Sequence, residues 1–262
     1  MKEFLTTRAV FTVEELDSAA AKNKGTRNSL LQYFRKQGRI VPVRRGLYLV
    51  VPAGMAPDAA LVDPYLIAAK AAPDAVIGYH SALEVHGRAY STFSTVTFFS
   101  ARLRGEFSFR GYSFRPVLPP AALRDAAEGQ NGVVRRNRAG VDLAVTGLER
   151  TLVDVLDRPL LSGGWEEVWR SLEAVEFFDL DAVVAYTLLL NNGATAAKVG
   201  FFLTQHKEAL MVEDRHLAPL LKLRPRQPQY WERAKRNGGK LNGEWNIIVP
   251  EEILRRSWEE VA

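Results

Sequence analysis

The sequence lacks cysteine altogether, contains only four histidines and has no long uninterrupted run of apolar residues. Without cysteine the chain can form no disulfide, no thiolate metal site and no cysteine nucleophile. Every apolar run is shorter than the roughly 18 residues that a membrane-spanning helix needs, so we expect no contact with a membrane. The first residues, Met1 to Phe4, do not lead into the apolar segment of a secretory signal, which favours a cytoplasmic location.

Charge is distributed unevenly along the 262 residues. Residues 1–50 carry ten basic and four acidic side chains, a net charge of +6, whereas the whole chain has a net charge of +5. Residues 51–262 therefore sum to −1. This asymmetry is typical of a module that binds a polyanion, joined to an electrically balanced region.

The basic region begins with a predicted helix–turn–helix. Thr12 is placed to cap a first helix, Glu15 completes a capping box, and Phe11 before the cap supplies a hydrophobic staple. This helix should run to about residue 21 and be followed by a polar turn at residues 22–25. A second helix is predicted from residue 26 or 27 to about residue 37, where Gly38 ends it.

Two short strands, residues 39–43 and 47–51, are predicted to follow the second helix, with Arg44 and Arg45 in the turn between them. Helix, turn, helix and basic hairpin is the order of a winged helix-turn-helix, which we predict for residues 1–55. In this class of domain the second helix presents polar side chains to base edges, while cations beside it contact phosphates. The alternative is a helix whose outer face is merely solvated and a hairpin that only packs against it.

The predicted partner of this domain is double-stranded DNA. We expect four polar residues to lie on the side of the second helix away from its apolar residues Leu30, Leu31 and Phe34. Asparagine and glutamine can pair with adenine, and arginine with guanine. The full predicted DNA-binding set comprises Lys24, Thr26, Arg27, Asn28, Gln32, Arg35, Arg39, Arg44 and Arg45, of which Arg27, Asn28, Gln32 and Arg35 are the four expected to face the bases.

Residues 51–57 are rich in proline and glycine and form the predicted boundary to a larger domain, residues 58–262. Helices are predicted at 58–72 and 79–87, and strands at 94–100, 107–109, 111–117 and 141–145. A second capping-box pattern, from Thr146 to Glu149, predicts a helix to about residue 156. Further helices are predicted at 164–175, 180–190 and 194–205. Strands grouped between helices indicate an α+β fold for the whole chain.

Several segments resemble the AbiEi family, which comprises antitoxins and transcriptional regulators of abortive-infection toxin–antitoxin systems. The segments are RIVPVRRGLYLV, YHSALEVHG, TGLERTLVDVLDRP, GGWEEVWRSL, KVGFFL and QYWERAKRNGGKLNGEWNIIVPEEIL, in this order over nearly the whole chain. The resemblance implies an amino-terminal winged helix that represses its own promoter, with Arg27, Asn28, Arg44 and Arg45 at the matching DNA-contacting positions. It also implies a carboxyl-terminal antitoxin domain that counteracts a co-encoded nucleotidyltransferase-like toxin. Inverted repeats in such a promoter would require the protein to pair on DNA.

The segment from Glu149 to Asp154 permits two interpretations. As paired carboxylates, these two residues would suggest a metal-dependent nuclease, with the winged helix only targeting it. A spacing of five residues makes them diverge on a helix, however, so a structural role is favoured, with Arg150 and Asp154 forming an ion pair at i and i+4. This pair also belongs to a possible antitoxin surface.

A second basic region lies between residues 222 and 240, where seven basic residues surround Tyr230 and Trp231. Aromatic residues between cations are typical of a nucleic-acid platform, but the aromatic pair could equally anchor the chain to the core. Arg226, Tyr230, Arg233, Lys235 and Arg236 are its candidate contact residues.

The histidines do not have the spacing of a metal site. His80 and His86 are six residues apart rather than four, and His206 and His216 are isolated. We therefore expect no metal, no cofactor and no catalytic residue, and a protein that is not an enzyme. A regulator that senses a small molecule in its larger domain remains a further alternative.

Overall fold

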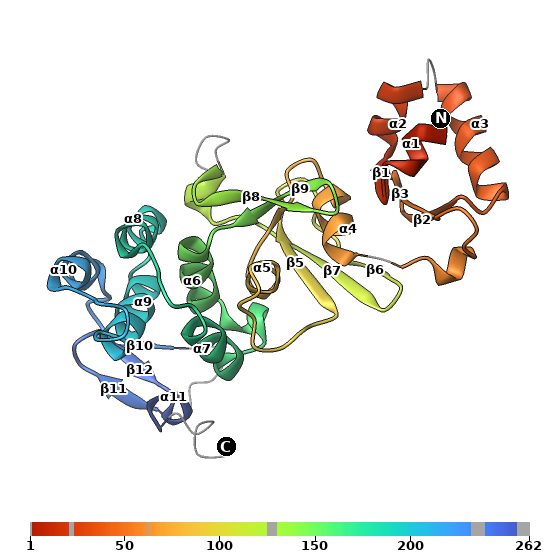
Figure 1. The fold of residues 1–262 in the computed structure, drawn as a ribbon. Helices are drawn as coiled ribbons and strands as arrows, with labels where there is room; N and C mark the ends of the chain where they lie inside the picture. Colours follow the sequence, from red (N-terminus) through yellow and green to blue (C-terminus); the bar gives the residue numbers. More distant parts are fainter. Residues whose placement is uncertain (1, 21–23, 62, 125–129, 232–238, 256–262) are drawn as a thin grey trace. The chain divides into compact units, whose positions relative to one another are not determined.

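The computed structural model describes residues 2–20, 24–61, 63–124, 130–231 and 239–255, and its fold is mixed α+β (Figure 1). The chain divides into two compact units. Unit 1 contains Met1–Ile77, Ser94–Leu118 and Arg135–Ala144, and unit 2 contains Gly78–Phe93, Pro119–Val134 and Val145–Ala262. The predicted linker at residues 51–57, between domains 1–55 and 58–262, falls inside unit 1, and this division of the chain stays a prediction.

The first fifty residues contain the expected two helices and hairpin, together with a short helix and a strand that the sequence analysis missed. The elements are α1 (Lys2–Thr6), β1 (Val10–Thr12), α2 (Val13–Ala20), α3 (Lys24–Lys36), β2 (Ile40–Arg44) and β3 (Leu47–Val50). The strands form an antiparallel sheet of order β1-β3-β2. Helix α3 begins at Lys24, inside the segment predicted to be a turn, and residues 21–23 lie outside the described residues.

The predicted capping box of α2 is confirmed. The Thr12 amide donates to Glu15 Oε2 at 2.8 Å, and the Glu15 amide donates to Thr12 Oγ1 at 3.3 Å. Phe11 and Leu16, at the two positions of a hydrophobic staple, are both fully buried in one cluster. These contacts fix where α2 begins and how the chain enters it.

The end of α3 depends on glycine. Gly38 has a φ of +64°, a left-handed conformation that residues with a Cβ rarely adopt, and a Cβ there would lie 3.2 Å from Pro57. The predicted helix stop is thus confirmed. Beneath the helices and the sheet, one apolar cluster joins all six elements through Phe4, Leu5, Phe11, Leu16, Leu31, Phe34, Ile40 and Val50.

The rest of unit 1 is built around most of a six-stranded sheet of order β6-β7-β5-β4-β9-β8. Residues 133–134 of β8 and 145–146 of β9 belong to unit 2. Its strands are β4 (Val76–Ile77), β5 (Thr95–Phe99), β6 (Phe107–Phe109), β7 (Tyr112–Val117), β8 (Val133–Arg138) and β9 (Val141–Thr146). Strand β5 runs parallel to β7 and antiparallel to β4. Strands β5, β6, β7 and β9 confirm the predicted strands, whereas β4 and β8 were not predicted.

Helix α4 (Pro64–Ala71) packs against β4 and β5 and against β1 and β3. It is shorter than the predicted helix at 58–72, because a single 3₁₀ turn, η1 (Pro57–Ala59), precedes it and Asp63 caps it. The Asp63 carboxylate accepts a hydrogen bond from the Tyr65 amide at 3.0 Å. Pro64 at the first helical position fits this start.

Unit 2 is mainly helical. Its elements are α5 (His80–Val85), η2 (Ala121–Leu123), α6 (Leu148–Asp157), η4 (Pro159–Ser162), α7 (Trp165–Glu173), α8 (Leu180–Leu190), α9 (Gly193–Gln205), α10 (Asp214–Leu223), β10 (Gln229–Tyr230), β11 (Lys240–Asn242), β12 (Ile247–Val249) and α11 (Glu251–Arg255). Helices α6, α8, α9 and α10 pack on one another, and the small sheet β10-β12-β11 meets α9 through β12. None of the described helices has the length and hydrophobicity needed to cross a lipid bilayer.

The capping box predicted at the start of α6 is wrong. Gly147, which has no side chain, caps this helix. Thr146 instead ends β9, and its hydroxyl lies 2.7 Å from that of Thr151 in the core. Glu149 accepts a hydrogen bond from the Asp179 amide at 3.4 Å, so it contacts the start of α8 rather than its own helix.

Candidate nucleic-acid interface and pocket

The outward side of α3 is polar and exposed. Leu31 and Phe34 are buried, while Ser29, Gln32 and Lys36 lie on the opposite side of the helix and are exposed. Asn28 and Arg35 flank this row on one side, and Thr26 and Tyr33 flank it on the other. The surface offers hydroxyl, amide, aromatic and cationic groups within a single helix of 13 residues.

The predicted DNA-binding residues fall into two groups. Thr26, Asn28, Gln32, Arg35 and Arg45 are exposed, whereas Arg27, Arg39 and Arg44 are half-buried. Lys24 opens α3, and its side chain lies outside the description. Nε of Arg39 is buried and has no hydrogen-bond partner among the described residues.

Arg27 is not on the outer side of α3, so its predicted placement is wrong. Its guanidinium donates to Asp17 Oδ2 at 2.7 Å, and only 21% of its side chain is exposed. Arg27 lies on the same side as Leu31 and Phe34, since positions separated by four and seven residues share a helix face. It therefore links α3 to α2.

Arg44 at the end of β2 is also held by the protein. Nη1 of Arg44 donates to the main-chain oxygen of Ala71 at 2.9 Å, and its guanidinium lies 5.1 Å from the centre of the Phe107 ring. Nearby, Lys70 of α4 pairs with Glu15 at the start of α2. Arg44 and Lys70 thus fasten the first fifty residues to α4 and β6 within unit 1, and the next residue, Arg45, points to solvent.

Three exposed residues of α3 lie outside the predicted DNA-binding set: Ser29, Tyr33 and Lys36. Tyr33 is 58% exposed, an unusual position for a large aromatic side chain in a short helix. Counting the helical period from Leu31 and Phe34 would have found all three, because each falls outside the buried arc.

The division into two compact units separates the charge more strongly than a division of the chain at residue 50. Unit 1 holds eighteen basic and nine acidic side chains, a net charge of +9. Unit 2 holds seventeen basic and twenty-one acidic side chains, a net charge of −4. The sheet of unit 1 therefore adds to the positive charge of the first fifty residues.

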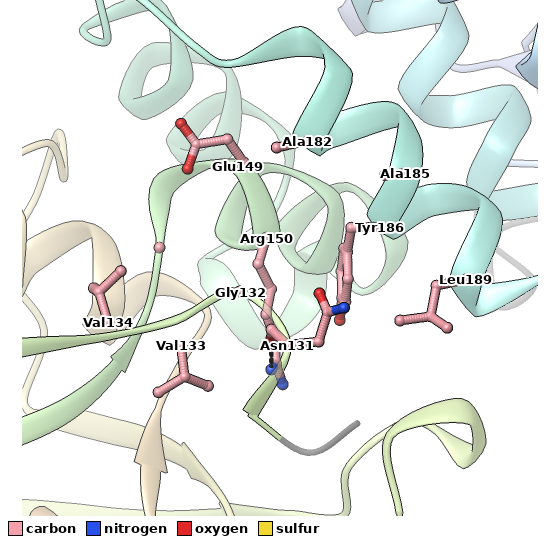
Figure 2. A pocket seen from close by; sticks show the side chains of 11 residues that line it. Asn131, Gly132, Val133, Val134, Glu149, Arg150, Ala182, Ala185, Tyr186 and Leu189 are labelled. Atoms are coloured by element: carbon pink, nitrogen blue, oxygen red, sulfur yellow. Dashed lines mark hydrogen bonds between the residues drawn. The ribbon is translucent and has the colours of Figure 1, made fainter. Parts of the chain in front are cut away.

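Unit 2 contains a half-open pocket of about 540 Å³ (Figure 2). The residues that line it come from the start of β8, the start of α6 and one side of α8: Asn131, Gly132, Val133, Val134, Gly147, Glu149, Arg150, Ala182, Ala185, Tyr186 and Leu189. Its walls are largely apolar. Figure 2 shows the guanidinium of Arg150 beside Asn131 and Tyr186, with Glu149 pointing away from them.

The predicted ion pair between Arg150 and Asp154 is confirmed, and it is buried. Nε of Arg150 lies 3.3 Å from Asp154 Oδ2, and each side chain is 2% exposed. Nη1 of Arg150 donates to the Asn131 main-chain oxygen at 2.6 Å, and the Tyr186 hydroxyl donates to Asp154 Oδ1 at 2.8 Å. The pair therefore joins the wall of the pocket to the helical core.

Burial raises the pKa of Asp154 from 3.8 to about 6, although Arg150 and the hydrogen bond from Tyr186 act in the opposite direction. Burial and the Asp154 carboxylate also raise the pKa of the Tyr186 phenol well above its ordinary value. The structure gives Glu149 and Asp154 different partners, the Asp179 amide for one and Arg150 with Tyr186 for the other.

The histidine side chains have hydrogen-bonding partners in unit 2. His80 is buried, its Nε2 lies 3.0 Å from Glu167 Oε1, and its ring stacks on Phe93 at 3.9 Å. Burial would raise the pKa of Glu167, but hydrogen bonds from Ser91 and His80 outweigh it, and that pKa lies below its ordinary value. Among the described residues, no group of three or more acidic or histidine side chains is placed to bind a metal ion.

The second basic region is described in part. Arg226 and Tyr230 are exposed, whereas Trp231 is buried against Trp165 and Phe201, with ring centroids 5.0 and 5.3 Å away. Trp231 therefore anchors this segment to the core of unit 2. Arg233, Lys235 and Arg236 lie outside the described residues.

The fold is similar to that of the RV2827C protein from Mycobacterium tuberculosis, as seen in its crystal structure. The two sequences are 17% identical, the match covers 98% of this chain and 92% of that one, and the TM-score is 0.59. At this identity the likeness shows the fold alone. A scan against protein families gives no match, and neither does a search of curated proteins.

Proposed function

We propose that this protein is a transcriptional regulator that binds double-stranded DNA through its first fifty residues and represses its own promoter. The observation that carries the proposal is the outward side of α3, where Asn28, Gln32 and Arg35 are exposed in the unit that carries a net charge of +9. Side chains with amide or guanidinium groups form the hydrogen bonds that distinguish base edges in the major groove.

The order of the elements supports this proposal. Helices α1, α2 and α3 with strands β1, β2 and β3 follow one another as in a winged helix-turn-helix, with α3 in the place of the recognition helix. The turn between β2 and β3 would be the wing. Arg45 is the cation of this turn that is exposed and can contact a phosphate.

A competition experiment tests the proposal. The full chain is mixed with a labelled duplex from the region upstream of its own gene, and unlabelled duplexes of the same or of unrelated sequence compete for it. We expect the upstream sequence to compete better, and the variant Asn28→Ala/Gln32→Ala to lose this preference, because a bidentate base contact is worth about 1–3 kcal/mol of discrimination.

Gln37→Ala is the matched control, since Gln37 is exposed but lies just after the last residue of α3. It should bind as the wild type does. If the double variant keeps the full preference for the upstream sequence, α3 is not the reading element. In a gel mobility-shift titration of the same duplex, two copies bound to an inverted repeat would appear as two successive shifted bands.

We further propose an antitoxin function for this regulator, on the resemblance to the AbiEi family. The partner would be a nucleotidyltransferase-like toxin encoded by the neighbouring gene. The candidate surface comprises the exposed Arg226 and Tyr230. Arg150 and Asp154 were predicted to belong to it, but each is only 2% exposed, so they are too buried to contact a partner. Coexpression with that neighbouring gene tests this directly. The variant Asn28→Ala/Gln32→Ala should still restore the growth of cells that express the toxin. In this proposal unit 2 neutralises the toxin and unit 1 binds the promoter.

The pocket of unit 2 favours a second candidate function, a regulator that responds to a small molecule. Its volume of about 540 Å³ lies within the range of sites that hold drug-sized ligands, about 300–1,000 Å³. A thermal-shift screen of metabolites with the full chain tests this candidate. A ligand that raises the melting temperature of the wild type but not of Ala185→Trp, a variant that would fill the pocket, would support it.

A further inference from the structure

The hairpin formed by β8 and β9 is the feature of unit 1 that the proposed function leaves unexplained. Strand β8 lies at the edge of the six-stranded sheet, and β9 is its neighbour. The two strands are joined by Ala139 and Gly140, whose φ values of +48° and +77° suit the tight turn of a two-residue hairpin. The hairpin can be followed in green in Figure 1.

Beyond its first residue, β8 is exposed on both of its faces. In a strand that packs on a core, alternate side chains are buried. Here the five successive residues from Val134 to Arg138 are all exposed, so neither face of this part of β8 is buried in a core. This exposure is the pattern of a projecting ribbon rather than of a core strand.

Three of the five exposed residues from Val134 to Arg138 are arginines. Arg135 is on one face of β8, and Arg136 and Arg138 are on the other, because side chains alternate along a strand. Asp142 of β9 accepts a hydrogen bond from Asn137 at 2.8 Å. Three cations and one acid therefore give the hairpin a net charge of +2.

Arg138 holds the hairpin in place within unit 1. Its Nε pairs with Asp63, the residue that caps α4, and its guanidinium lies 4.8 Å from the centre of the Tyr65 ring. Arg138 is thus a positioning residue. Arg135 and Arg136, further from the turn, are exposed to solvent.

We propose that the β8–β9 hairpin is a second DNA-contacting element, in which Arg135 and Arg136 bind backbone phosphates of the duplex. The inference rests on the proposed function of α3 as the reading element. A two-stranded ribbon fits the major groove of B-DNA as a helix does, and arginine is well suited to phosphate because of its fork of donors. The hairpin adds affinity without adding base recognition.

The test is the salt dependence of DNA binding by the full chain. Fluorescence anisotropy gives the affinity for a duplex several helical turns long, taken from the region upstream of the gene, between about 50 and 200 mM salt. Each phosphate contact contributes about 0.9 to the slope of log K against log salt concentration. The variant Arg135→Gln/Arg136→Gln should therefore have a slope shallower by about two, with an unchanged preference for the upstream sequence.

The control Arg124→Gln/Arg215→Gln removes the same charge from exposed positions of unit 2, and its slope should equal that of the wild type. If the wild type binds the duplex and Arg135→Gln/Arg136→Gln has the same slope, this inference is overturned and the proposed function is not. The arginines would then serve to prevent pairing of the edge strand β8 with another chain. Absence of any DNA binding overturns the proposed function as well. Tighter binding of a single-stranded RNA of the same length, weakened by the variant, would also contradict the assignment to duplex DNA.

Discussion

Arg44 donates a hydrogen bond to the main-chain oxygen of Ala71 at 2.9 Å, so an arginine predicted to contact DNA is held instead by the last turn of α4. Cations are favoured at this end of a helix, where main-chain carbonyls lack partners. The neighbouring Arg45 is exposed. Two adjacent arginines are therefore placed differently: Arg44 joins parts of unit 1, and Arg45 faces solvent.

Substitution of these two arginines should separate stability from DNA affinity. Arg44→Ala removes the hydrogen bond to Ala71 and the contact with the Phe107 ring, and should lower the free energy of unfolding by about 1–2 kcal/mol. Arg45→Ala should leave that free energy unchanged and weaken DNA binding several-fold at low salt. Urea denaturation and anisotropy measure the two effects. Equal losses of stability in both variants would contradict the division of roles.

Arg27 should contribute to stability rather than to base recognition. Arg27→Ala breaks the half-buried ion pair with Asp17 and should cost about 1 kcal/mol or less, since partly screened pairs are weak. Its preference for the upstream sequence over unrelated DNA should match that of the wild type, whereas Gln32→Ala should reduce it. A competition titration with both variants measures this preference. A loss of preference in Arg27→Ala would show that Arg27 takes part in base recognition.

Asp154 should make the protein less stable as pH rises. Its folded-state pKa of about 6 lies above the value of 3.8 expected in the unfolded chain, so folding binds a proton between these values. The contribution is complete below about pH 4 and is lost as pH rises through 6, a change on the order of 3 kcal/mol.

The variant Asp154→Asn should lack this part of the pH dependence, and the control Asp214→Asn, at a side chain that is 92% exposed, should retain it. The measurement is the midpoint of urea unfolding at several pH values. If the wild type and Asp154→Asn show parallel curves between pH 4 and pH 7, the carboxyl is not desolvated as the structure indicates.

Gly200 should be essential to the packing of α9 against the small sheet of unit 2. A Cβ at Gly200 would lie 2.1 Å from the ring of Trp245, which is fully buried. Gly200→Ala should therefore destabilise the protein by about 1–3 kcal/mol or more. Gly243→Ala, where a Cβ meets nothing within 4 Å, is the matched control. Comparable unfolding midpoints for the two variants would show that Trp245 does not pack on α9 in solution.

Local patterns predicted those features that depend on neighbours in sequence. The capping box at Thr12 and Glu15 and the stop at Gly38 involve residues a few positions apart, and both are confirmed. The same pattern failed at Thr146 and Glu149. There the threonine hydroxyl faces Thr151 in the core and the start of α8 supplies a donor to the glutamate, and neither contact could be read from the pattern itself.

Placement of the candidate site depended on contacts distant in sequence. The sequence pattern predicts a DNA contact for Arg44 and does not reveal its partners in the protein. These partners, Ala71 and Phe107, lie 27 and 63 positions further along the chain. Strand β8 was missed because its side chains do not alternate between apolar and polar. That missed strand carries the arginines of the hairpin, so local periodicity alone could not reveal this part of the basic unit.

The affinity of the full chain for its upstream duplex, measured at about 50 and 200 mM salt, decides whether unit 1 binds duplex DNA. With six or more phosphate contacts, the affinity should fall by about 10³-fold or more over this range. Binding that is undetectable at about 50 mM salt, or equally tight at both concentrations, would show that unit 1 does not bind duplex DNA through phosphate contacts.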